Sequence, residues 1–277
     1  MVLTPIEIYE LKGKSVSVKR DDLLGDGVQY PRWAKIEGIR SLLLSEYIDK
    51  SKPLVHLSVY GSWTGWVLAE LCKELGLKFI SAYPNTKKYP ESILKRIENT
   101  GAELMPLKPN MMNVLDNRVA GIARENGWQK LPNAFNHPIY IAYMRNRMKE
   151  VLETQDFDHL VVAMGSGVTA SGLIQEFLNY DSIFSIIKNK RQVHSITMSS
   201  IKSTQLVLNK NGVGGFNNIH ITKSPFAFDD MMPEYKVPFD CNEFWDKKMW
   251  YWLDANIESL EGRILFWNIG GSYLDSI

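Results

Sequence analysis

Cysteine is scarce in this chain. Cys72 and Cys241 are the only two cysteines among 277 residues, and neither belongs to a Cys-x-x-Cys or a Cys/His cluster. This scarcity excludes a zinc site and a disulfide-stapled scaffold, so no metal is predicted. It is also typical of proteins kept in a reducing compartment, and we expect a cytoplasmic location.

Long apolar runs and an excess of one charge are also missing. No stretch approaches the roughly 18 apolar residues that span a bilayer, and Met1–Glu7 lacks the basic and apolar pattern of a secretory signal. Lysine and arginine number 32 against 31 aspartates and glutamates, a formal net charge of +1. We therefore expect no membrane partner, and no global field that attracts nucleic acid.

Strand-like runs alternate with helical patterns along the whole chain. Such alternation predicts βαβ units, a mostly parallel sheet and the α/β class. The stretch 209–218, rich in Asn and Gly, is expected to be a loop. The predicted strands are 15–19, 54–59, 78–82, 103–107, 159–163, 193–198 and 264–267, and the predicted helices are 34–48, 64–75, 90–100, 114–126, 138–154 and 171–178.

A glycine turn at 165–169 joins a β-branched strand to a helical pattern. Gly165 and Gly167 allow a positive φ and a close approach of the backbone to a ligand, and Ser166 and Thr169 add hydroxyl donors. The following helix adds unpaired N–H groups and the positive end of its dipole. These features suit a phosphate monoester. The alternative is a tight turn that binds nothing.

Several motifs in chain order resemble the fold-type II pyridoxal-phosphate enzymes, in the branch of 1-aminocyclopropane-1-carboxylate deaminase and D-cysteine desulfhydrase. The turn at 165–169, GSGVT, resembles the phosphate loop GSGGT of that family. The resemblance covers nearly the whole chain, although this chain is shorter than typical members. The other motifs that carry it are VKRDDL at 18–23, AKIE at 34–37, GS at 61–62, NHP at 136–138, GRILF at 262–266 and IGGS at 269–272.

The resemblance implies a two-lobed fold like that of the tryptophan synthase β subunit, with mostly parallel sheets. Residues 1–49 and 136–277 are expected to form the cofactor-binding lobe, and 50–135 a smaller inserted lobe. Pyridoxal 5'-phosphate is expected in the cleft between the lobes. Its phosphate is expected to meet Gly165, Ser166, Gly167, Val168 and Thr169. A homodimer is the assembly to test.

The lysine that forms an imine with the cofactor is displaced relative to the family motif. Alignment on Lys35-Ile36-Glu37 puts Arg32 at that position. A guanidinium stays protonated and cannot act as the nucleophile, whereas a lysine amine can. We therefore predict Lys35 as the Schiff-base lysine and Arg32 as a substrate- or phosphate-binding residue. The alternative for Lys35 is a solvated lysine at a helix start.

Two further departures affect the chemistry. Phe244 takes the place of a family tyrosine, so it can stack but cannot transfer a proton, which argues against cyclopropane ring opening. Ile269 replaces a threonine, which leaves Ser272 or Asn268 to meet the pyridine nitrogen. A hydroxyl at that position is expected to leave the nitrogen unprotonated, which makes the ring a weaker electron sink.

The serine loop offers a second group of candidates. Ser62, with Gly61 and Thr64, is predicted to hold the substrate carboxylate or the cofactor O3' at a helix N-terminus. The alternative is a plain N-cap. His56, His137 and His194 are scattered and show no triad spacing, so we expect structural roles for them.

Aromatic residues alternate with lysines at 245–252, and a basic run occupies 188–191. Such a combination can stack bases and meet phosphates. We favour the simpler interpretation, an amphipathic helix with its tryptophans toward the core and its lysines in water.

The function these features predict is a pyridoxal-phosphate-dependent lyase, of the deaminase, desulfhydrase or decarboxylase type. It forms an imine with a small amino-acid-like amine and labilises a Cα bond. One alternative is a decarboxylase or lyase acting on an amino-acid-modified base in viral DNA, a nucleic-acid-linked substrate. Another is a non-catalytic binding protein that kept the phosphate loop.

Overall fold

The computed structural model describes residues 3–180, 191–232 and 234–276. The chain divides into two compact units. Unit 1 contains residues 1–24, 32–34 and 141–272, and unit 2 contains 25–31, 35–140 and 273–277. The lobe boundaries proposed from sequence, at 49/50 and 135/136, stay a prediction.

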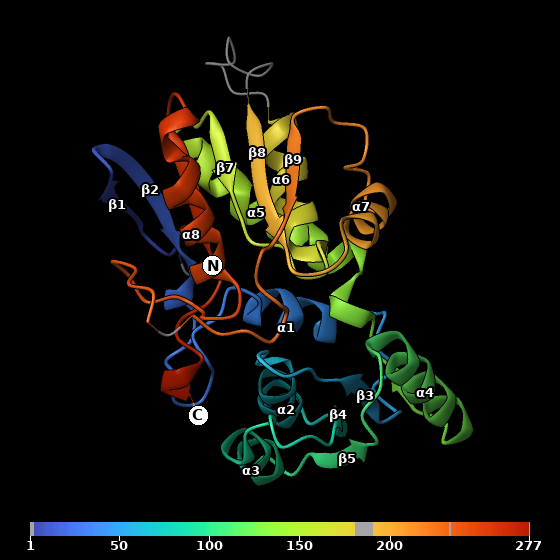
Figure 1. The fold of residues 1–277 in the computed structure, drawn as a ribbon. Coiled ribbons are helices and arrows are strands. Elements are labelled where there is room, and N and C mark those ends of the chain that lie inside the picture. Colours follow the sequence, from blue (N-terminus) through green and yellow to red (C-terminus); the bar gives the residue numbers. More distant parts are fainter. Residues whose placement is uncertain (1–2, 181–190, 233, 277) are drawn as a thin grey trace. The chain divides into compact units, whose positions relative to one another are not determined.

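Unit 1 is built on a six-stranded sheet in the order β1-β2-β10-β7-β8-β9 (Figure 1). All neighbouring strands are parallel except β1 and β2, which pair as an antiparallel hairpin. The sheet is therefore mixed at one edge and parallel elsewhere. Its strands are β1 (Ile6–Leu11), β2 (Lys14–Arg20), β7 (His159–Val161), β8 (Gln192–Thr197), β9 (Ile219–Lys223) and β10 (Ile264–Asn268).

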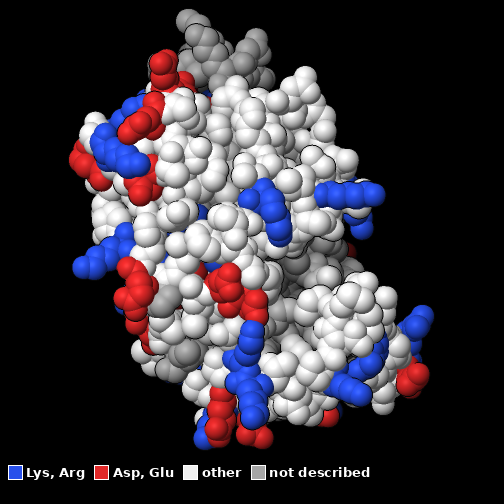
Figure 2. All heavy atoms as spheres, in the orientation of Figure 1, with Lys and Arg blue, Asp and Glu red and all other residues white. Residues whose placement is uncertain are grey.

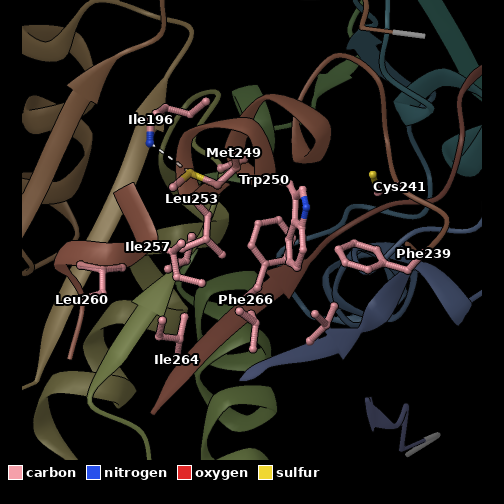
Figure 3. Close-up of a cluster of buried hydrophobic side chains, with 14 of the residues drawn as sticks. Ile196, Phe239, Cys241, Met249, Trp250, Leu253, Ile257, Leu260, Ile264 and Phe266 are labelled. Carbon is pink, nitrogen blue, oxygen red and sulfur yellow. Dashed lines mark hydrogen bonds between the residues drawn. The ribbon is translucent and has the colours of Figure 1, made fainter. Parts of the chain in front are cut away.

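One face of this sheet is covered by α8 (Asp246–Asn256), drawn in front of the strands in Figure 1. Met249, Trp250 and Leu253 of the helix pack on apolar side chains of the strands, with Phe266 of β10 against the Trp250 ring (Figure 3). The Ile196 backbone N–H of β8 donates to the Met249 sulfur at 3.3 Å. This cluster fixes the start of α8 relative to the carboxyl ends of the strands.

The other face carries α5 (Pro138–Thr154) and α6 (Val168–Asn179), which lie behind the strands in Figure 1. The two helices touch at Gly172, where a Cβ would lie 2.6 Å from the Ile141 carbonyl oxygen. Only glycine permits so close a helix contact. The short helix α7 (Ile201–Lys210) follows β8.

Unit 2 has a four-stranded parallel sheet in the order β5-β4-β3-β6. Apolar residues of α4 pack on one face of the strands. On the other, Gly65 of α2 lies close to Ser58 and Ser81, with its would-be Cβ 2.7 Å from the Ser58 oxygen. The elements are α1 (Ile36–Leu44), β3 (Leu54–Leu57), α2 (Thr64–Glu74), β4 (Phe79–Pro84), α3 (Glu91–Asn99), β5 (Glu103–Leu107), α4 (Met112–Glu125) and β6 (Gln129–Lys130).

The predicted elements are present, with some changes at their ends. The helix predicted at 34–48 is shorter, because it begins at Ile36 and ends at Leu44. The loop predicted at 209–218 begins later, because α7 continues to Lys210. In the described part of the chain, no helix is long and apolar enough to cross a membrane.

Candidate functional site

The glycine turn connects β7 to α6 at the carboxyl edge of the unit 1 sheet. Gly167 is the N-cap of α6 and has a left-handed backbone, with φ of +88°. The expectation of a positive φ is thus confirmed at Gly167, while Gly165 keeps an ordinary φ. The Ser166 hydroxyl oxygen accepts from the Val168 N–H at 3.3 Å. The N–H groups in the first turn of a helix have no partner within that helix, and those of α6 lie beside the Ser166 and Thr169 hydroxyls. Such a set of donors suits a phosphate.

Gly165 allows a close packing contact rather than a left-handed backbone. A Cβ on this residue would lie 3.0 Å from Cζ3 of Trp245, so the indole packs directly on the backbone of the turn. At Gly167, a Cβ would lie 3.4 Å from the Thr204 methyl group. The turn is therefore held close to its neighbours on both sides.

Three carboxylates on the segment 240–246 hold the chain end that follows β10. Asp246, which is buried, accepts from the Ile269 and Gly270 N–H groups at 3.4 and 3.2 Å. Asp240 accepts from the Ser272 N–H at 2.7 Å. Sequence reasoning did not identify these residues. The feature of the sequence that could have indicated them is three carboxylates spaced Asp-x-x-Glu-x-x-Asp at the start of a helix.

The third carboxylate of that segment faces the predicted pyridine-binding serine. The Ser272 hydroxyl donates to the Glu243 carboxylate at 2.7 Å, and Glu243 is 1% exposed. Asn268, the alternative to Ser272, is fully buried and donates to the Asp240 carbonyl at 2.7 Å. Phe244 is also buried. Ser272, half-exposed and oriented by a carboxylate, is thus the better placed of the two candidates.

Arg32 and Lys35 belong to different units, although they are only three positions apart in the sequence. Arg32 is exposed in unit 1, and its Nη1 pairs with Asp240 Oδ2 at 3.3 Å. Lys35 is half-buried and is the N-cap of α1 in unit 2. Their proposed roles stay predictions.

Ser62 lies in the turn between β3 and α2 in unit 2. Its Oγ lies 2.6 Å from the Thr64 hydroxyl and accepts weakly from the Thr64 N–H at 3.3 Å. Gly61 before it has a φ of +74°. The N-cap of α2 is Trp63 rather than Ser62, which leaves the serine half-exposed at the carboxyl end of β3.

The stretch 245–252 forms the start of α8, as the simpler interpretation predicted, with Trp250 in the core. The expectation that its lysines lie in water is wrong for Lys248. This residue is fully buried and donates from Nζ to the Ala227 carbonyl at 2.7 Å. Burial lowers the pKa of Lys248 to about 8, against the opposing effect of Asp230 and Asp229. Residues 188–190 of the basic run lie outside the described residues.

The histidines that seemed scattered in the sequence include a row across three neighbouring strands. His159 Nδ1 lies 3.1 Å from His194 Nε2, and the rings of His194 and His220 stack at 5.2 Å. Burial, together with the charges of His159 and His220, lowers the pKa of His194 to about 4. Within the described residues, no group of three or more His, Cys, Asp and Glu is arranged to hold a metal ion.

Comparison with known proteins identifies the enzyme family to which this chain belongs. Residues 9–200 match the family described as pyridoxal-phosphate dependent enzyme, and the chain belongs to that family. A relative from Pseudomonas phage M6, a glycyl-dTMP PLP-dependent decarboxylase, is 27% identical over 287 residues. The match covers 96% of this chain and 98% of the relative.

Solved structures show the same fold. An ACC deaminase homologue matches with a TM-score of 0.71 and 21% identity, covering 98% of this chain and 90% of the other. A hydrogen sulfide-producing enzyme from Fusobacterium nucleatum matches with a TM-score of 0.68 and 13% identity, covering 97% and 96%. The chain is a pyridoxal-phosphate-dependent enzyme of fold type II, and its cofactor is pyridoxal 5'-phosphate.

The residues present fit this cofactor. The left-handed Gly167, two hydroxyls and a helix N-terminus supply neutral donors for a phosphate. Ser272, backed by a buried carboxylate, supplies a polar contact of the kind that a pyridine nitrogen requires. Sequence and structure therefore agree on the cofactor.

Proposed function

We propose that this enzyme removes the carboxyl group from an amino acid carried on a nucleotide. The observation that carries the proposal is the match to the glycyl-dTMP decarboxylase, which extends over almost the full length of both proteins. The nucleic-acid-linked substrate is thereby favoured over a free amino acid.

Each predicted residue has a role in this proposal. Gly165, Ser166, Gly167, Val168 and Thr169 would hold the cofactor phosphate, and Ser272 would meet the ring nitrogen. Lys35 would be the covalent anchor, and Phe244 would pack near the ring without transferring protons. When bound, pyridoxal phosphate supplies an electron sink for the bond that breaks at Cα.

The substrate would be held by the remaining candidates. Ser62, Gly61 and Thr64 offer hydroxyl and backbone donors to a carboxylate, and Arg32 offers a cation. In the proposed reaction the bond from Cα to the carboxylate carbon breaks, carbon dioxide leaves, and a proton is added to Cα. Lys35 is the lysine closest in sequence to the motif position occupied by Arg32. Its side-chain amine could deliver this proton when the amine is not bound to the cofactor.

The lyase of the deaminase type remains the second candidate. It is favoured by the fold shared with the ACC deaminase homologue. It is disfavoured by Phe244, because the phenyl ring has no hydroxyl with which to move a proton. We also infer a cytoplasmic location, consistent with the two buried free thiols, and we propose a homodimer as its assembly.

The products distinguish these reactions. The cofactor-loaded enzyme is incubated with glycyl-dTMP, and carbon dioxide and ammonia are measured in the same sample. Carbon dioxide without ammonia is the expected result, and Lys35→Ala should abolish its release. Ammonia release without carbon dioxide would instead assign the deaminase reaction.

A further inference from the structure

An exposed phenylalanine, Phe228, lies in the segment between β9 and α8, which Figure 1 draws in orange. Phe228 is 37% exposed, in the turn 227–230. The Ala227 N–H donates to Asp230 Oδ2 at 2.7 Å, and the Ala227 carbonyl accepts from the Lys248 ammonium at 2.7 Å. Hydrogen bonds from both sides therefore hold the turn, so the aromatic ring is presented at a defined position.

One aromatic residue, Trp245, connects this ring to the glycine turn at 165–169. Phe228 packs edge-on against Trp245, with 4.9 Å between ring centroids and an interplanar angle of 83°. Trp245 in turn packs on the backbone of Gly165. The aromatic chain Phe228–Trp245 thus leads from the surface of unit 1 to the turn that binds the cofactor phosphate.

Charge near the ring selects the kind of group that it can bind. Asp229 and Asp230 follow Phe228 directly, and they disfavour a phosphate directly over the ring, so the phosphate of a bound nucleotide would have to point away from them. On the face drawn in Figure 2, basic and acidic side chains are intermixed, without a broad basic surface for a nucleic-acid backbone. A neutral aromatic base, in contrast, gains from stacking on an exposed ring.

We propose that Phe228 is the platform on which the pyrimidine base of the nucleotide-linked substrate stacks, with Trp245 supporting it from below. The inference rests on the proposed function, because the base is the part of that substrate which a free amino acid lacks. Stacking on a fixed ring would hold the base at the surface of unit 1, on the side of Trp245 that faces away from Gly165. Phe228 is thus a specificity-determining residue for the nucleotide.

Binding of nucleotides to the cofactor-loaded enzyme tests the platform without turnover. The probes are dTMP, a short oligothymidylate and 2-deoxyribose 5-phosphate, all of which lack the reacting amino acid. Their dissociation constants are measured by calorimetry for wild type, Phe228→Ala, Phe228→Trp and Leu206→Ala. Leu206 is the matched control, because it is an exposed apolar residue of the same unit, on α7. Visible absorbance checks that each variant retains the cofactor.

Wild type should bind dTMP or the oligothymidylate and not the base-free sugar phosphate. Phe228→Ala should weaken binding about tenfold, within the range for loss of one base–aromatic stack. Phe228→Trp and Leu206→Ala should bind as wild type does. A tighter complex with the oligothymidylate than with dTMP would assign the platform to a base within a polymer.

Equal dissociation constants for wild type and Phe228→Ala would overturn the platform, as would failure of wild type to bind either thymine probe. Carbon dioxide release from glycyl-dTMP is measured separately on the same preparations. If carbon dioxide release is the same in Phe228→Ala and in wild type, the proposed reaction is supported and the platform is not. If nucleotide binding depends on Phe228 but no carbon dioxide is released, the platform is supported and the proposed reaction is not.

Discussion

The Ser272 hydroxyl donates its only proton to the carboxylate of Glu243, at 2.7 Å. A hydroxyl has one donor and two acceptor lone pairs, so Ser272 can offer only a lone pair to a further partner. An acceptor pairs with a protonated ring nitrogen. From sequence alone, a serine at this position was expected to leave the pyridine nitrogen unprotonated. With its proton directed to the buried Glu243 carboxylate, Ser272 would instead favour a protonated nitrogen.

We predict that Glu243→Gln lowers kcat by at least about tenfold, or about 1.4 kcal/mol of barrier. The amide can donate to Ser272 and free the hydroxyl proton for the ring nitrogen, which weakens the electron sink. Steady-state kinetics and equilibrium binding of pyridoxal phosphate measure the effect. The cofactor affinity should change much less than kcat, and the exposed Glu258→Gln is the control. Unchanged turnover would place Glu243 among purely structural residues.

Gly167→Val should abolish retention of pyridoxal phosphate. A β-branched residue is strained at a φ of +88°, and its side chain would approach Thr204 and the ligand surface of the turn. Gly212→Val is the control, since Gly212 has a similar φ of +74° in the same unit, away from the turn. Both variants should lose comparable stability in urea unfolding, but only Gly167→Val should lose the cofactor after dialysis. Normal retention in Gly167→Val would refute the phosphate-loop assignment.

Lys35 and Arg32 should respond differently to truncation. Lys35→Ala is expected to lose the visible band of lysine-linked cofactor and the activity together, because no amine remains for the covalent bond. Arg32→Ala should keep the band and bind substrate more weakly. Absorbance spectra and mapping of the borohydride-reduced peptide give the assignment. A reduced adduct on any other lysine contradicts it.

Acid should destabilise the fold through His194. Its pKa is about 4 in the folded protein, lowered mainly by burial, against an ordinary value of 6.5. Below pH 6.5 the unfolded chain binds the proton more readily, so its contribution to stability is present above that pH and is lost between about pH 6.5 and 4. Urea unfolding of unit 1 should show a loss of roughly 1–2 kcal/mol between pH 7 and 5.

His194→Gln is expected to flatten that part of the pH dependence, because the amide does not titrate. The exposed His220→Gln, from the same row of rings, should keep most of the pH dependence, because burial is the main cause of the lowered pKa of His194. His56, also buried, has its pKa lowered to about 3 and should add a loss of its own in unit 2. Equal pH profiles for wild type and His194→Gln would show that the row is not the source.

Periodicity and turn residues were sufficient to predict most elements. The helix from Pro138 to Thr154 and the strand from Glu103 to Leu107 have the predicted bounds, and the helix begins at a proline, which is favoured in the first helical turn. The strands β1, β6 and β9 and the helix α7 were missed. The three strands lie at sheet edges and have few fully buried positions, so their apolar pattern is weak.

The site was predicted only where a local motif encodes it. Gly167 could be identified because a left-handed turn requires glycine within a short, recognisable stretch. The contact of Trp245 with Gly165, and that of Glu243 with Ser272, join residues far apart in the chain. No local pattern specifies such pairs. The buried Lys248 was misjudged for the same reason, since its partner Ala227 lies in a separate segment.

The position of β10 has a consequence for the order in which the two sheets are completed. Among the strands of the described residues, β10 comes last in the chain, yet it lies between β2 and β7 and pairs with both. Until residues 264–268 emerge from the ribosome, the first hairpin and the strands β7 to β9 have no shared sheet, and their facing edges stay open. Unit 2 draws almost all its residues from the continuous stretch 35–140 and can close its sheet much earlier. The sheet of unit 1 can therefore be completed only after that of unit 2, and its inner strand edges are exposed in the meantime.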